Sequence, residues 1–194
     1  MKEISGGVTA AKGFKAAGIH VGVKSKNSSK KDLALIVSDA ECAAAAVYTL
    51  NKVKAAPIYV TMDNIEDGTA RAIICNSGNA NACAPNGHEN AVKICAAAAS
   101  ELGIKTSDVI VASTGVIGQE INVSVIENGM HELVLHLSES GSSDAAAAIM
   151  TTDTVQKEVA VQFMLGGKSV KMGGIAKGSG MIHPNMGTML CFIT

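Results

Sequence analysis

RAIICNSG at residues 71–78 and DVIVASTGVIG at residues 108–118 flank the segment HENAVKICAAAASELGI at residues 88–104. Each of the two outer segments starts with a β-branched run that leads into small polar residues and glycine, a pattern typical of a buried strand followed by a loop. The middle segment is rich in alanine, follows an Asn-Gly turn and ends near Gly103, which predicts a helix. This order of strand, helix and strand indicates an α/β protein.

The same alternation extends in both directions along the chain. LALIVSD (33–39) predicts another buried strand, and the polar segment 24–32 before it is expected to be an exposed loop. Downstream, Ser143 or Asp144 is suited to cap a helix that ends in the polar sequence TTDT at residues 151–154. Helices therefore continue to alternate with extended segments.

The last part of the chain reads as extended structure. EVAVQFMLGGKSVKMGGIAKGSG (158–180) predicts a hairpin whose turn is formed by Gly166 and Gly167. The apolar run at residues 189–193 predicts a buried strand, and a chain that stops inside such an element suggests truncation or cleavage of a longer precursor. We expect a single domain over residues 1–194, of class α/β (α+β) with a mixed sheet.

Composition limits the classes of function. The 194 residues are 47% hydrophobic but only 3% aromatic, and the formal net charge of -1 argues against partners such as nucleic acids or membrane surfaces. We expect a cytoplasmic protein, because the sequence has neither a signal-peptide pattern nor an apolar stretch of the roughly 20 residues that span a membrane. Five cysteines without a CxxC pair argue against a disulfide framework or a zinc site.

Two loops after predicted strands are candidate sites. CNSGNANAC (75–83) is as consistent with a purely structural loop as with one that supports a site, since it holds no pair of nucleophile and base. In STGVIG (113–118), Gly115 allows close approach of a ligand, and the Thr114 hydroxyl and Gly115 amide could face a developing oxyanion. On pattern alone, a simple strand-to-helix turn is the favoured interpretation of this second loop.

The segment AKGSGMIHPNMGTML (176–190) is the densest candidate. Lys177 lies among small residues, where partial desolvation would lower its pKa or leave it free to bind a carboxylate. Gly187 and Thr188 precede an apolar run, an arrangement found in N-terminal threonine nucleophiles, whose hydroxyl attacks the preceding carbonyl. The α-amine freed by that cleavage, with a reference pKa of about 8, then serves as the base. From the residues alone, such a Gly-Thr pair is commonplace. For His183, a structural role is the favoured interpretation.

Several of these motifs occur together, in order and along essentially the whole chain, as in one family. The sequence resembles the ornithine acetyltransferases of arginine biosynthesis, the bifunctional ArgJ family. The matching motifs are GVTAAKGFKAAGIHVGVK (7–24), AAVYTLNKVKAAPI (45–58), NSGNANAC (76–83), STGVIG (113–118), TTDT (151–154) and KGSGMIHPNMGTML (177–190). The combination is far more specific than any one motif.

The resemblance implies a fold and a set of site residues. The family has an α/β/β/α layered fold like that of self-processing hydrolases, and its precursor cuts itself before a threonine, so this sequence would be an α chain completed by a β chain. Gly187 stands where the family usually has alanine. The roles that carry over are nucleophile for Thr188, oxyanion hole for Thr114 and Gly115, substrate binding for Thr151, Lys177 and Thr188, and cleavage between Gly187 and Thr188.

The resemblance also implies a reaction. The family transfers acetyl from N-acetylornithine to glutamate through a threonine acyl-enzyme, without a cofactor or a metal, as paired αβ units (α2β2). Some members also use acetyl-CoA, which the sequence leaves open. The alternatives are a threonine-nucleophile amidohydrolase or aminopeptidase, and a non-catalytic subunit that completes a partner's sheet. Because this chain continues past Gly187 to Thr194, the chain break lies either before Thr188 or after Thr194.

Overall fold

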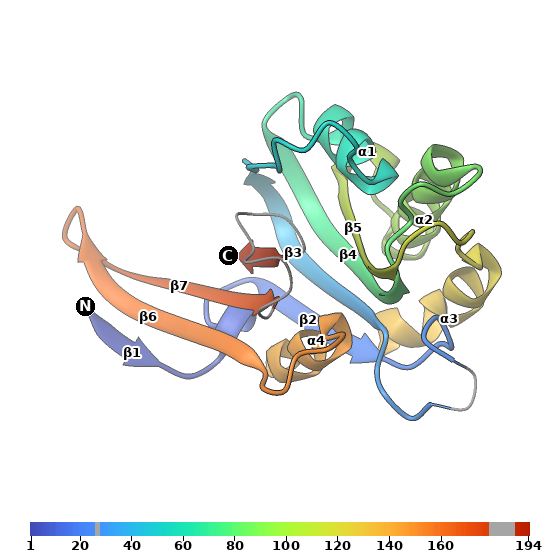
Figure 1. The fold of residues 1–194 in the computed structure, drawn as a ribbon. Coiled ribbons are helices and arrows are strands. Elements are labelled where there is room, and N and C mark those ends of the chain that lie inside the picture. Colours follow the sequence, from blue (N-terminus) through green and yellow to red (C-terminus); the bar gives the residue numbers. More distant parts are fainter. Residues whose placement is uncertain (26–27, 179–188) are drawn as a thin grey trace.

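Two four-stranded sheets form the framework of the protein (Figure 1). The computed structural model describes residues 1–25, 28–178 and 189–194. The first sheet, called the central sheet here, runs in the order β2 (Phe14–Ile19), β3 (Leu33–Ala43), β4 (Thr69–Asn79) and β5 (Val109–Val116). Its first three strands are antiparallel, whereas β4 and β5 are parallel. The prediction of strands at 33–39, 71–78 and 108–118 is confirmed.

The second sheet, called the hairpin sheet here, is antiparallel throughout. Its order is β1 (Lys2–Ile4), β6 (Lys157–Leu165), β7 (Lys168–Lys177) and β8 (Leu190–Ile193). Gly166 and Gly167 form the turn between β6 and β7 with φ angles of 56° and 77°. Two successive positive φ angles match the right-handed twist of a hairpin, so the predicted hairpin and its turn are confirmed.

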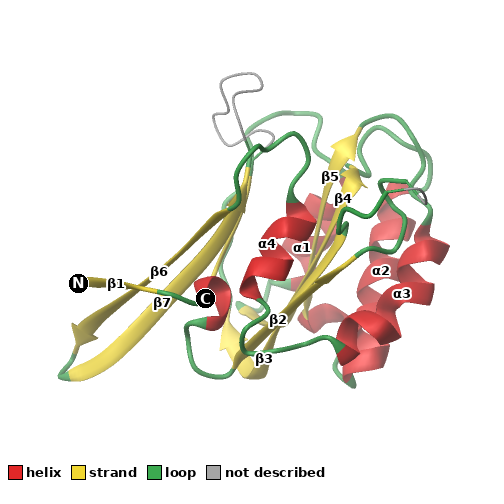
Figure 2. Ribbon diagram, turned by 90° about the horizontal axis from the view of Figure 1, so that it is seen from below, coloured by secondary structure: helices red, strands yellow, loops and turns green. Residues whose placement is uncertain are grey.

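The helices occupy two different layers. Helices α1 (Ala56–Asn64), α2 (Gly87–Leu102) and α3 (Val123–Leu135) lie beside the central sheet, on the side away from the hairpin sheet, and α4 (Ser142–Ile149) lies between the two sheets (Figure 2). Short 3-10 turns occur at Gly7–Thr9 and Thr106–Asp108. The mixed α/β class is confirmed, and the order of layers is helices, central sheet, α4 and hairpin sheet.

The central sheet is buried on both faces. Successive side chains along one of its strands enter two different cores. Leu33 and Leu35 of β3 pack in the core that the central sheet shares with α2 and α3. Ala34 and Ile36 point the other way, into the core formed with α4 and the hairpin sheet. A strand covered on both faces needs a continuous apolar run, which explains the sequence LALIV.

The predicted helix ends are correct in one case and wrong in the other. Helix α2 stops at Gly103, whose φ of 65° is the left-handed conformation that glycine adopts readily at a helix end. Helix α4, in contrast, is capped by Gly141 and not by Ser143 or Asp144. A Cβ at Gly141 would lie 1.8 Å from the Ala16 oxygen, so the close approach of α4 to β2 requires glycine at this cap.

The segment 24–32 is not simply the exposed loop that was predicted. Asp32 is fully buried, and its carboxylate accepts hydrogen bonds from the backbone amides of Val21, Gly22 and Lys24 at 2.7, 3.1 and 3.0 Å. A buried carboxylate needs such donors. Asp32 therefore folds the loop onto the central sheet.

The strand predicted at residues 189–193 is confirmed, but its burial is not. Leu190 and Phe192 of β8 pack against the core between the sheets, whereas the alternate residue Ile193 is 64% exposed. This difference arises because successive side chains of a strand point to opposite faces, and only the face of β8 with Leu190 and Phe192 lies on the core.

Two further sequence predictions concern the cysteines and membranes. All five cysteines are free, and Cys75 and Cys95 are buried as small apolar residues. Across the described residues, no helix combines the length and apolar character that crossing a membrane requires.

Candidate active site

The loop predicted to bind an oxyanion lies where two parallel strands end. Thr114 and Gly115 are close to the carboxyl end of β5, next to Ser77 and Gly78 of β4. Gly115 has a φ of 137°, and a Cβ there would come within 2.3 Å of the Gly78 carbonyl carbon. Any larger residue would be strained and would push the strands apart. The glycine therefore keeps the loop closed against β4.

The asparagine-rich motif after β4 builds the neighbouring turn. Asn76 is buried, donates to the Asn79 oxygen at 2.8 Å and accepts from the Ser113 hydroxyl at 2.6 Å. Asn79 in turn accepts from the Asn81 amide at 2.7 Å. These contacts shape the loop itself, and the bond from Ser113 also fixes the residue next to Thr114. Both interpretations of the motif, structural loop and support of a site, fit this geometry.

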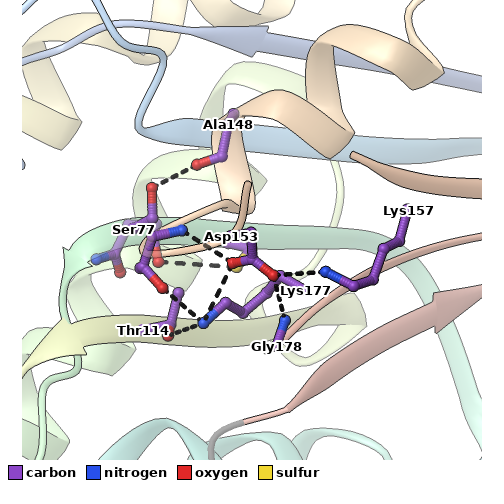
Figure 3. A network of polar contacts seen from close by, with 10 residues as sticks. Ser77, Thr114, Ala148, Asp153, Lys157, Lys177 and Gly178 are labelled. Carbon is purple, nitrogen blue, oxygen red and sulfur yellow. Dashed lines mark hydrogen bonds and ion pairs between the residues drawn. The ribbon is translucent and has the colours of Figure 1, made fainter. Parts of the chain in front are cut away.

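Lys177 contacts two of the other predicted site residues, Thr151 and Thr114. It ends β7 with only 5% of its surface exposed, and its Nζ donates to the Thr151 Oγ1 at 2.7 Å and to the Thr114 Oγ1 at 3.3 Å. Thr151 follows α4, so the three residues come from the hairpin sheet, from the turn after α4 and from the central sheet. Figure 3 shows Lys177 directed at Thr114 across this junction.

The chemistry of lysine determines what the two threonines can do. An ammonium group can only donate hydrogen bonds, so both hydroxyl oxygens act as acceptors toward Lys177. Within the described part of the chain, the hydroxyl hydrogens of Thr114 and Thr151 then remain available for a third group. That group must be an acceptor, such as a carbonyl oxygen, an oxyanion or a carboxylate. The cluster is therefore suited to bind a negatively charged or developing oxygen.

Asp153 completes the cluster, and sequence reasoning missed it. Its side chain is 1% exposed and accepts from Lys157 Nζ at 2.7 Å, Gly178 N at 2.8 Å and Thr151 N at 3.2 Å. Burial by itself would raise the pKa of Asp153, but the hydrogen bonds from Lys157, Gly178 and Thr151 outweigh it and lower the pKa to about 2. An aspartate between threonines usually marks a turn, so the sequence signal for this role was weak.

Ser77 joins the candidate site to the scaffold. Its hydroxyl donates to the Ala148 backbone oxygen at 2.5 Å (Figure 3). Its backbone amide donates to the backbone carbonyl oxygen of Asp32 at 2.9 Å. These bonds tie β4 to the last turn of α4 and to the buried end of the loop before β3. The end of α4 leads directly to Thr151, so this contact helps to set the distance between the two threonines.

The other predicted site residues belong to the segment 179–188, which the structure does not describe. Gly187 and Thr188, the expected cleavage point and nucleophile, and His183 lie outside the described residues.

Cys75 is near the cluster, but burial raises the pKa of its thiol to about 12. A thiol with that pKa stays protonated at neutral pH and is a poor nucleophile. Among the residues that the structure describes, no group of three or more His, Cys, Asp or Glu could hold a metal ion.

Comparison with known proteins identifies the family. The model of the ArgJ family matches residues 15–194. The chain belongs to the ArgJ family. It is 48% identical, over its full length, to the arginine biosynthesis bifunctional protein ArgJ of Symbiobacterium thermophilum, and it covers 48% of that relative. The family resemblance inferred from the motifs is confirmed, and the chain spans about half the length of the curated relatives it matches.

Solved ArgJ structures share the fold. A crystal structure of the arginine biosynthesis bifunctional protein ArgJ from Bacillus halodurans is 46% identical with a TM-score of 0.88, and the match covers 97% of each chain. The structure of ornithine acetyltransferase from Mycobacterium tuberculosis, complexed with ornithine, is 37% identical with a TM-score of 0.86 and covers 97% of this chain and 99% of that one. The arrangement of the two sheets is therefore that of ArgJ structures.

Proposed function

We propose that this chain is the N-terminal part of an ornithine acetyltransferase that transfers acetyl from N-acetylornithine to glutamate. The observation that carries the proposal is the meeting of Lys177, Thr151 and Thr114 in one cluster, in which the buried ammonium donates hydrogen bonds to both threonine hydroxyls. Membership of the ArgJ family and the likeness to an ornithine acetyltransferase complexed with ornithine support this choice of substrate.

In the proposed reaction, Thr188 is the nucleophile. Its hydroxyl attacks the acetyl carbonyl of N-acetylornithine while its α-amine accepts the hydroxyl proton. The tetrahedral oxyanion accepts hydrogen bonds from the Thr114 hydroxyl and the Gly115 amide, each donor worth about 3 kcal/mol. The C–N bond then breaks, the proton passes to the departing ornithine amine, and the acetyl group remains on Thr188 as an ester. The amine of glutamate then attacks that ester, the bond between the acetyl carbon and the Thr188 oxygen breaks, and N-acetylglutamate leaves.

The charges of the cluster suit an amino-acid substrate. Lys177 and Lys157 contribute two positive charges and Asp153 one negative charge, which leaves an excess of one positive charge around a buried junction. We assign Lys177 and Thr151 to binding the substrate, through its α-carboxylate or through the oxyanion. The residues in the proposal require neither a cofactor nor a metal.

The same hydroxyl would also process the precursor. Attack of Thr188 on the Gly187 carbonyl, followed by hydrolysis, separates an α chain from a β chain, and Thr188 becomes the N-terminus of the β chain. The β chain would supply the other substrate contacts, and two αβ units would assemble as α2β2. We expect this assembly in the cytoplasm, with small molecules and not nucleic acids or membranes as its binding partners.

The proposal is tested with the complete precursor. Mass spectrometry of the purified protein is expected to locate the chain break between Gly187 and Thr188, and N-acetylornithine and glutamate are expected to yield ornithine and N-acetylglutamate. Thr188→Ala is expected to give one uncut chain without transferase activity, whereas Thr188→Ser, which keeps a hydroxyl, is expected to be cut.

Other outcomes select the alternatives. Two fragments from the Thr188→Ala variant would exclude Thr188 as the processing residue and point to a break after Thr194. Release of acetate without transfer to glutamate would indicate an amidohydrolase or aminopeptidase. An intact two-chain complex without either activity would indicate a non-catalytic subunit. Replacing N-acetylornithine by acetyl-CoA as the acetyl donor, with glutamate kept as the acceptor, measures whether acetyl-CoA is also used.

A further inference from the structure

The carboxylate of Asp153 has no role in the reaction proposed above, although it lies next to both Thr151 and Lys177. Its Oδ1 accepts from Lys157 Nζ of β6 and from the Gly178 amide just after β7. Its Oδ2 accepts from the Thr151 amide and lies 3.9 Å from Lys177 Nζ. One buried side chain therefore connects the turn after α4 with both long strands of the hairpin sheet (Figure 3).

Lys177 needs an anion at this place. Its side chain is only 6% exposed, and a buried ammonium without a nearby negative charge is strongly unfavourable. In the part of the chain that the structure describes, Asp153 is the only carboxylate within 4.0 Å of Lys177 Nζ. Asp153 is thus the group that makes a charged Lys177 tolerable between the two sheets.

The distance between these two charges also matters. At 3.9 Å the carboxylate attracts the ammonium without taking the short hydrogen bond that a direct contact would form, and Lys177 Nζ donates instead to Thr151 at 2.7 Å. Lys157, Gly178 and the Thr151 amide meanwhile occupy three of the roughly four lone-pair positions of the Asp153 carboxylate. The ammonium therefore remains directed at the threonine hydroxyls.

We infer that Asp153 is a positioning residue that holds the Lys177 ammonium against Thr151 and Thr114 and acts on acetyl transfer through Lys177. The inference rests on the proposed function. It predicts that the charge of Asp153 affects acetyl transfer only while Lys177 is present. A merely structural role, in which Asp153 fixes the Thr151 and Gly178 backbone, would make its loss equally harmful with or without the lysine.

A double-mutant cycle in the complete processed protein separates these two roles. Asp153→Asn keeps the size of the side chain and is expected to lower kcat/KM about 10- to 100-fold, because it removes the charge that holds a buried partner. In the background of Lys177→Met, the same substitution is expected to change kcat/KM by less than about threefold. Equal factors in the two backgrounds would overturn the inference.

Asp144→Asn is the matched control. Asp144 also forms an ion pair with a lysine, Lys31, but its side chain is 59% exposed and lies away from Lys177 in the first turn of α4. The same chemical change there is expected to leave kcat/KM within about twofold of wild type, because exposed ion pairs contribute little. A loss as large as that of Asp153→Asn would overturn the inference, since it would not depend on contact with Lys177.

Two further measurements keep the test decisive. The single variant Asp153→Asn could fail to fold. In that case, a folded and soluble double variant Asp153→Asn/Lys177→Met supports the pairing of the two charges. If the double variant also fails to fold, the inference is overturned. If the wild-type protein transfers no acetyl group, the proposed function fails, and a crystal structure of Asp153→Asn tests the positioning by itself. Lys177 Nζ is then expected beyond about 3.5 Å from the Thr114 hydroxyl. An unchanged contact would overturn the inference.

Discussion

The central sheet and the hairpin sheet differ in how much of each is covered. The central sheet has a packed core on both faces, so that Leu35 and Ile36 on neighbouring positions of β3 are both buried. The hairpin sheet buries Ile175 on its inner face, whereas Val159, on the other face of the sheet, is 56% exposed. The two sheets share a single core around α4.

The two sheets therefore contribute differently to stability and to the candidate site. The doubly covered sheet holds Thr114 and Gly115 in a packed scaffold, while the singly covered sheet carries Lys177 at its inner end. The cluster forms only because the two sheets meet. We therefore expect substitutions in the central sheet to act mainly on stability, and substitutions at the junction to act mainly on catalysis.

The largest effect is expected in the core of the central sheet. Leu35 is fully buried, and Leu35→Ala should lower the free energy of unfolding by about 2 to 5 kcal/mol through lost burial and the cavity left behind. Chemical denaturation of the complete protein measures this loss, with Leu35→Met as the volume-conserving control. A loss below about 1 kcal/mol would mean that the doubly covered sheet is not the main source of stability.

The next effect concerns the end of the same sheet that faces the junction. Thr114→Ala should lower kcat about 10²- to 10³-fold, or about 3 to 4 kcal/mol, because it removes one donor to the oxyanion. The melting temperature should change little, since Thr114 is only half-buried. Thr152→Ala, at an exposed threonine beside Thr151, is the control. Turnover near that of wild type would exclude the Thr114 hydroxyl as an important donor and leave the Gly115 amide untested.

A smaller effect is expected from the Asp153 charge, which connects the turn after α4 with the hairpin sheet. The pKa of Asp153 is lowered to about 2 from an ordinary value of 3.8, so the folded protein gains stability above pH 4 that is lost as the pH falls from about 4 to about 2. Because Lys157 is partly exposed to water, we expect about 1 to 2 kcal/mol.

Denaturation of wild type and of Asp153→Asn at pH 6 and at pH 2.5 isolates this contribution. The wild-type protein should lose more unfolding free energy between the two pH values than the variant does, and Asp144→Asn should behave like wild type. Identical losses in wild type and Asp153→Asn would show that the charge of this carboxylate does not stabilise the folded protein.

The smallest effect is expected on the outer face of the hairpin sheet. Val159→Ala should change the free energy of unfolding by no more than about 0.5 kcal/mol, because the side chain is largely exposed. Ile175→Ala, on the inner face of the same sheet, should cost about 2 to 5 kcal/mol. A large loss from Val159→Ala in the complete protein would show that this face is covered there, and the contrast between the sheets would disappear.

Much of the local structure could be predicted from the sequence. The strands at 33–39, 71–78 and 108–118, the helix ending at Gly103 and the hairpin turn at Gly166 all follow from hydrophobic periodicity and from residues that adopt special φ angles. The motifs also singled out Thr114, Thr151 and Lys177 through their resemblance to the ArgJ family, although their roles in the reaction remain proposals.

How these segments pack against one another depends on tertiary contacts that the sequence pattern does not specify. Thr114 and Lys177 lie 63 positions apart, and their 3.3 Å contact depends on the packing of two sheets around α4. The burial of Asp32, the cap at Gly141 and the contacts of Asp153 were missed for the same reason. Hydrophobic periodicity reports which face of an element is apolar, but the partner of a polar side chain is set by contacts between segments distant in sequence.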